Sequence, residues 1–79
     1  MSWIHRTLHG YHEWKCSRER TFQNKTVYAD AIVTAESGDS DAPANWEVLR
    51  DGTPIARGHS STVRDAKRAS FGAMWKARQ

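Results

Sequence analysis

Residues 45–58, NWEVLRDGTPIARG, carry the strongest structural signal in the chain. The dipeptide Asp51-Gly52 separates two strand-like runs, and it favours the two-residue primed turns that connect β-hairpins. The segment therefore predicts a hairpin of strands 46–50 and 53–58.

The turn also predicts which side chains face each other across this hairpin. Counting outward from it places Val48 opposite Ile55 and Trp46 opposite Arg57, so that the guanidinium group of Arg57 would lie over the Trp46 ring. Pro54 cannot donate a hydrogen bond to a neighbouring strand. We therefore expect the second strand of the hairpin to lie at an edge of the sheet.

A helix is predicted over residues 62–77. Thr62, followed three residues later by Asp65, is typical of a helix N-terminus. Small and apolar residues recur at helical spacing and would face the sheet. These residues are Val63, Ala66, Ser70, Ala73, Met74 and Ala77.

Two further strands are predicted upstream of the hairpin. Residues 11–17 alternate between two faces, and residues 26–36 place small side chains on one face and larger ones on the other. Residues 26–36 also match a helical period, but their β-branched and aromatic content favours a strand. Residues 17–25 are predicted to form a loop and residues 37–44 a flexible acidic loop. Residues 1–10 show no clear pattern and would form an irregular segment, a short amphipathic turn or an edge segment of the sheet.

Together these elements predict an α+β fold, in which a small antiparallel sheet of three or four strands carries one C-terminal helix on one face. The 79 residues suit a single domain. The single cysteine, Cys16, excludes an internal disulfide framework. No apolar run is long enough for a membrane span or a signal peptide. We therefore expect a cytoplasmic protein with no membrane partner.

Charge is distributed unevenly along the chain. Residues 1–25 and 53–79 are basic and residues 26–52 are acidic, although the net charge is only +3. Such asymmetry can make one basic and one acidic face. The alternative is that the blocks neutralise each other across the fold.

The sequence offers few groups for catalysis or metal binding. His5, His9, His12 and Cys16 resemble a zinc-binding set, but a strand holds His12 and Cys16 about 13 Å apart, too far for one ion. The chain also lacks a glycine-rich phosphate loop and a nucleophile elbow. We therefore expect no enzymatic activity, no catalytic or metal-ligating residues and no cofactor.

Arginines and aromatic residues alternate along one side of the predicted helix. This stripe would suit a nucleic-acid backbone or a protein partner. Alternatively, the helix is rotated so that Phe71 and Trp75 belong to the core. The predicted binding residues are Arg57, Arg64, Arg68, Arg78, Trp46, Trp75 and Tyr28.

From Trp46 onward, the segments WEVLRDGTPIARG, STVRDAKRA and AMWK follow the order strand, turn, strand, helix. This pattern resembles small phage-encoded anti-defence proteins, in particular a type I-F anti-CRISPR of comparable size. The resemblance implies a non-enzymatic protein of a phage or mobile element that occludes a host nucleic-acid-handling complex. The same unit resembles the arm-binding domains of phage integrases, which implies direct binding of DNA or RNA. A structural or self-assembling subunit, such as a homodimer, is the third interpretation.

Overall fold

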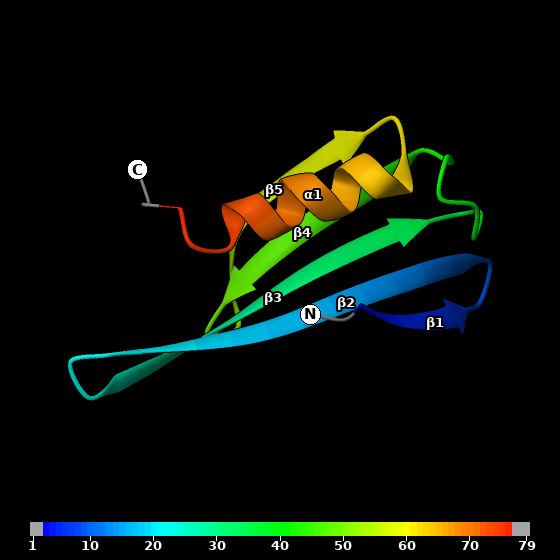
Figure 1. Cartoon of the computed structure of the whole chain (residues 1–79). Helices are drawn as coiled ribbons and strands as arrows, with labels where there is room; N and C mark the ends of the chain where they lie inside the picture. The colour runs from blue at the N-terminus through cyan, green and yellow to red at the C-terminus, as the bar shows by residue number, and fades with distance from the viewer. Residues whose placement is uncertain (1–2, 77–79) are drawn as a thin grey trace.

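Five strands follow one another along the chain and pair in the same order in an antiparallel sheet (Figure 1). The computed structural model describes residues 3–76. One helix, α1, completes the fold and confirms the predicted α+β class, with five strands in place of three or four. The elements are β1 (Ile4–Leu8), β2 (Tyr11–Phe22), β3 (Lys25–Ala35), β4 (Ala44–Arg50), β5 (Thr53–Ser60) and α1 (Val63–Ala73).

The helix α1 packs on one face of β3, β4 and β5 (Figure 1). As predicted, the β3 residues beneath it are small, and Ala29, Ala31 and Val33 are fully buried. Small side chains at these positions allow the helix to approach the sheet closely. The opposite face of the sheet, called here the helix-free face, has no covering element among the described residues. No helix in residues 3–76 is long and apolar enough to cross a membrane.

Of the alternatives for residues 1–10, the edge segment is correct for residues 4–8, which form β1, and the irregular segment and the amphipathic turn are wrong there. This strand pairs with β2, from Ile4 opposite Lys15 to Leu8 opposite Tyr11. It lies at an edge of the sheet and is exposed along most of its length. Because neither of its sides is deeply buried, its sequence lacks the alternation of apolar and polar residues that would have marked it as a strand.

The predicted loop over residues 17–25 is also wrong. The strand β2 continues to Phe22, and β3 begins at Lys25 after a two-residue turn. Gln23 and Asn24 in this turn have φ angles of 52° and 65°, which is the backbone conformation of a primed hairpin turn. The end of this hairpin extends beyond the helix (Figure 1). Residues 19–28 are called the arm below.

The Asp51-Gly52 turn forms as predicted, with φ angles of 51° and 83°. A bulge between Val48 and Leu49 then shifts the register of the hairpin by one residue. The new partners are Val48 and Ala56, Glu47 and Arg57, and Trp46 and Gly58. The predicted stacking of Arg57 on Trp46 is therefore wrong. The strand β5 does lie at an edge, as the proline predicted.

The helix begins as the sequence predicts. The Thr62 side chain accepts a hydrogen bond of 3.0 Å from the backbone N–H of Asp65. Residues of the predicted core stripe are buried against the sheet, and the helix ends at Ala73, four residues before the predicted end. The buried members of the stripe are Val63, Ala66, Ser70 and Met74, and Ala77 lies outside the described residues.

Candidate functional site

Three of the predicted binding arginines lie in exposed ion pairs with nearby acids. The pairs are Arg57 with Glu47 at 3.6 Å, Arg64 with Asp41 at 3.1 Å and Arg68 with Asp65 at 3.8 Å. Exposed pairs of this kind contribute little to stability. They do neutralise the positive charge that a polyanionic partner would meet at these arginines.

The other predicted binding residues do not form one patch. Tyr28 is 56% exposed on the helix-free face. Trp46 is half-buried on the opposite face, where it packs against both clusters of the core. Trp75 is half-buried just beyond α1, and Arg78 lies outside the described residues. The predicted set is therefore divided between the two faces of the sheet.

Two arginines of β2 lie over aromatic rings that follow one another on the helix side. The guanidinium carbon of Arg18 is 5.7 Å from the centre of the Phe71 ring. That of Arg20 is 4.5 Å from the centre of the Trp75 ring. Phe71 and Trp75 are half-buried, so the rings are neither sealed in the core nor fully solvated. Cation–π contacts at such sites contribute about 0.5–1 kcal/mol each and hold the arginines in place.

A third cation extends this arrangement toward the start of the helix. Lys67 lies one turn before Phe71, and its Nζ is 5.7 Å from the centre of the Trp3 ring and 5.3 Å from that of Trp14. Lys67 and Phe71 are spaced at i and i+4, so they share one side of α1, and Trp75 lies two residues after the helix ends. We call Arg18, Arg20, Lys67, Phe71 and Trp75 the cation–aromatic strip.

The strip is free of negative charge. Within residues 3–76, no carboxylate lies within ion-pair distance of Arg18, Arg20 or Lys67. Two nearby acids point away: Glu19, which lies between the two arginines in the sequence, and Asp30, on the paired strand β3, alternate onto the helix-free face. Asp30 accepts a 2.6 Å hydrogen bond from Ser17 on that face. The strip therefore presents three cations with no neutralising partner among the described residues.

Arg50 borders the strip but has a structural role. Its Nη2 donates hydrogen bonds of 2.7 Å to the Met74 carbonyl and 3.1 Å to the Lys76 carbonyl. Its guanidinium carbon is 5.8 Å from the centre of the Trp75 ring. Its Nε is buried and finds no partner among the described residues. Arg50 thus ties the C-terminal end of the helix to β4.

Sequence reasoning missed Arg18 and Arg20, because it placed them in a loop. The signal was present in the alternation of His12, Trp14 and Cys16, which continues through both arginines on the same face of β2. That alternation does not show which ring each arginine would meet, because Phe71 of the helix and Trp75 just beyond it lie more than fifty residues later in the chain.

The histidines near the N-terminus form a pair. A hydrogen bond of 2.9 Å joins His5 Nε2 to His12 Nδ1, and the two rings are stacked with their centres 5.1 Å apart. Trp14 continues the stack at 4.9 Å from His5. Cys16 is buried. No group of three or more His, Cys, Asp or Glu side chains in residues 3–76 is placed to hold a metal ion.

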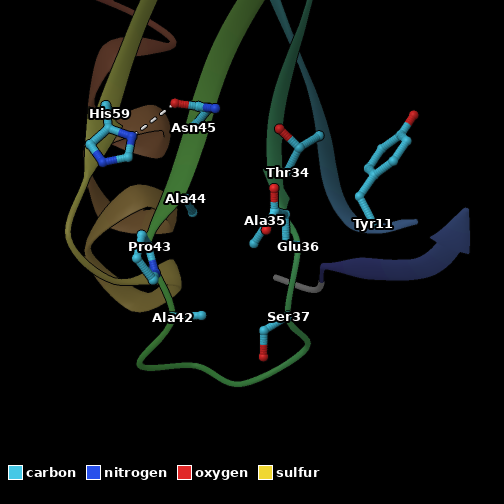
Figure 2. A pocket seen from close by; sticks show the side chains of 10 residues that line it. All are labelled: Tyr11, Thr34, Ala35, Glu36, Ser37, Ala42, Pro43, Ala44, Asn45 and His59. Carbon is cyan, nitrogen blue, oxygen red and sulfur yellow. Dashed lines mark hydrogen bonds between the residues drawn. The ribbon is translucent and has the colours of Figure 1, made fainter. Parts of the chain in front are cut away.

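Figure 2 shows an open pocket at the end of the helix-free face. Side chains of β3 and β4 line it together with the segment that connects them, and Thr34, Glu36 and Asn45 supply polar groups. At one side of the pocket, a hydrogen bond of 2.9 Å joins His59 Nδ1 to Asn45 Oδ1. The Nδ1 atom of this imidazole therefore already has a partner within the protein. The pocket lies on the face opposite to the cation–aromatic strip.

The resemblance of residues 46–79 to phage anti-defence proteins stays a prediction. The described part of this segment has the expected order of strand, turn, strand and helix. That order is a fold pattern and carries no functional residue by itself. Comparison of the chain with protein-family models, with curated proteins and with solved structures found no match.

Proposed function

We propose that this protein is a non-enzymatic binding module whose cation–aromatic strip contacts the phosphate backbone of a nucleic acid. The observation that carries the proposal is the contrast between two sets of cations. Arg18, Arg20 and Lys67 have no acidic partner among the described residues, whereas other arginines of the chain are paired. The paired ones are Arg6, Arg57, Arg64 and Arg68.

The arm supports this proposal by its shape and composition. A two-stranded β-ribbon fits the major groove of duplex DNA. The arm is such a ribbon. It contains two basic residues, Arg20 and Lys25, and one acidic residue, Glu19. At its tip Phe22 is 71% exposed, which gives a base an aromatic surface to stack on.

Charge also favours nucleic acid itself over a nucleic-acid-handling complex as the partner of the strip. The channels of such complexes are lined with lysine and arginine, because they hold a phosphate backbone. A cationic strip would be repelled by these channels and attracted by the backbone that they bind. The strip therefore suits the polyanion better than a protein surface made to bind that polyanion.

The salt dependence of binding tests the proposal. If the strip neutralises about three phosphates, the logarithm of the association constant should fall linearly with the logarithm of the salt concentration. The expected slope is near −2.7 for a duplex and near −2 for a single strand. Fluorescence anisotropy measures this association constant at increasing salt concentrations, with labelled DNA and RNA of about 20 nucleotides, both single- and double-stranded. We expect Arg18→Gln/Arg20→Gln to weaken binding about 10-fold and to bring the slope about 1.8 closer to zero for a duplex.

The matched control is Arg57→Gln/Arg68→Gln, which removes the same charge from paired positions. We expect the control to change affinity by less than about 3-fold, because each arginine already has an acidic partner. Equal losses in the two double variants would contradict a specific role of the strip. Absence of any binding at low salt would overturn the proposed function.

Occlusion of a host complex, the first interpretation of the sequence, is the second candidate. The acidic loop favours it, since Glu36, Asp39 and Asp41 are exposed. The loop is held in a turn by a 3.1 Å hydrogen bond from the Asp41 N–H to the Asp39 side chain. An acidic tip of this kind complements a cationic nucleic-acid channel.

A purified type I-F CRISPR surveillance complex tests the second candidate. If the acidic loop occludes the complex, an excess of the wild-type protein abolishes target-DNA binding by the complex. With the variant Glu36→Gln/Asp39→Asn in the same excess, we expect the amount of bound target DNA to rise at least about 10-fold. The control Glu19→Gln/Asp65→Asn removes the same charge outside the loop and should leave inhibition intact. Unchanged DNA binding in the presence of excess protein would exclude this target.

A further inference from the structure

The two sides of the arm carry different side chains. Because side chains alternate along a strand, every second residue lies on the same side of the sheet as the helix. These residues are Arg20, Phe22, Lys25 and Val27. Glu19, the one acid of the arm, lies on the opposite side. The helix side of the arm is therefore basic and apolar, and it continues the surface of the cation–aromatic strip toward the tip.

Phe22 projects from this side between two cations. Its side chain is 71% exposed. Lys25 faces it across the arm, where neighbouring strands lie about 4.8 Å apart. Arg20 lies two residues earlier on the same side, about 6.6 Å along the strand. Neither cation forms an ion pair within the described part of the chain. An open ring bordered by two free cations suits stacked bases that are bordered by phosphates.

The other rings on the helix side are less accessible. Arg18 lies over Phe71 and Arg20 over Trp75, and both rings are half-buried. Among the described Phe, Trp and Tyr residues, Phe22 is the only exposed one on this side. Proteins that bind a continuous single strand stack successive bases on several aromatic side chains. One open ring suits a single step between two base pairs better than a run of unpaired bases.

Hydrogen bonds fix the arm at its base and near its tip. At the base, the Tyr28 N–H donates a 2.9 Å bond to the Asp51 carboxylate, and the Asp51 N–H donates a 2.7 Å bond to the Tyr28 carbonyl. Near the tip, the hydroxyl groups of Thr21 and Thr26 are joined by a 3.0 Å bond. A ring presented on such a braced ribbon loses less conformational entropy on binding than a ring on a loose loop.

We propose that Phe22 is a wedge that enters between two base pairs of a nucleic-acid duplex, while Arg20 and Lys25 contact the phosphates beside it. An apolar side chain inserted in this way unstacks one base step and kinks the duplex. The free-energy cost is smallest where stacking is already broken. The preferred substrate is therefore a duplex with one weakened step, such as a single-nucleotide bulge. The wedge depends on the proposed function, because the strip must hold the same duplex.

A comparison of two labelled DNA duplexes of about 20 base pairs, one intact and one with a central single-nucleotide bulge, tests the wedge. By fluorescence anisotropy, we expect the wild-type protein to bind the bulged duplex at least about 10-fold more tightly. Phe22→Ala should remove this preference, because it removes the ring. It should leave the salt dependence unchanged, because it keeps every cation.

The kink provides a second measurement. Energy transfer between dyes at the two ends of the intact duplex should rise when the wild-type protein binds, because a kink brings the ends closer together. Phe22→Ala should bind at low salt without this rise. The same duplex and protein concentrations serve for both measurements.

Tyr28→Ala is the matched control, because it removes a ring that is 56% exposed on the opposite side of the arm. It should change the preference for the bulge by less than about 3-fold. Circular dichroism confirms that both variants are folded. Equal affinity for the two duplexes, a preference that survives Phe22→Ala, or a duplex that stays straight would overturn the wedge. Salt-dependent binding would then still support the proposed function, whereas absence of binding to every nucleic acid would overturn both.

Discussion

Replacing Gly58 by alanine is expected to lower the free energy of unfolding by about 3 kcal/mol, because the new methyl group would collide with the Trp46 ring. A Cβ atom at this position would lie 2.6 Å from Trp46 Cζ2 and 2.8 Å from Nε1. These distances are too short for any real contact, so the ring would have to move. Trp46 packs against both core clusters, and its displacement would disturb both.

A second glycine in the chain provides the control. Gly72 lies inside α1, and a Cβ atom added there meets nothing within 4 Å. Gly72→Ala should therefore raise the free energy of unfolding by about 0.5–1 kcal/mol through helix propensity alone. Urea denaturation followed by tryptophan fluorescence measures both variants. We expect the two substitutions to change the free energy of unfolding in opposite directions. A Gly58→Ala protein as stable as wild type would contradict the close packing of Gly58 against the Trp46 ring.

Arg50→Ala is expected to lower the free energy of unfolding by about 2–3 kcal/mol. The change removes two charge-assisted hydrogen bonds to carbonyls just beyond the end of α1, those of Met74 and Lys76. It also removes the positive charge that stabilises the C-terminal end of the helix dipole. The last turn of α1 contains no basic residue of its own.

Arg57→Ala is the matched control for this prediction, because it removes an arginine of the neighbouring strand that makes only one exposed ion pair. Its effect should stay below about 0.5 kcal/mol. Thermal unfolding followed by circular dichroism compares the two variants. If the two substitutions lowered the free energy of unfolding equally, Arg50 would not anchor the C-terminal end of the helix to β4.

The parts of the fold that the sequence predicted correctly are those with strong local signals. The Asp51-Gly52 turn, the Thr62 cap and the small residues of β3 each depend on residues close in the chain. The bulge between Val48 and Leu49 has no such local signal in the sequence. The pairing predicted by counting outward from the turn is therefore correct for the first two residue pairs, and beyond them it differs from the observed pairing by one residue.

Residues 19–25 of the arm were missed for a different physical reason, whereas residues 26–28 belong to the strand predicted over residues 26–36. Residues 19–25 are exposed on both sides, so burial imposed no alternation of apolar and polar residues on them. The turn of the arm is Gln23-Asn24, which lacks the glycine that marks the hairpin at 51–52. Polar composition alone then favoured a loop, although the backbone continues as two paired strands.

For the candidate site, the sequence predicted a helical stripe in which arginines alternate with Phe71 and Trp75, whereas the arginines that lie over these two rings come from β2. The helical stripe pointed to Arg64 and Arg68, which are close in sequence and are paired with acids. The cations that contact the rings come from β2, far away in the chain. Their positions depend on how the helix packs on the sheet, and no local pattern encodes that.

The order of the strands has a consequence for how the chain folds. Each strand pairs with the one made just before it, and three of the four connections are turns of two residues. Closing such short loops costs little chain entropy, so successive hairpins can form without a search through distant segments. Within residues 3–76, the docking of the helix on β3, β4 and β5 joins segments that lie further apart in the sequence. That step is the one expected to govern the rate at which the native state is reached.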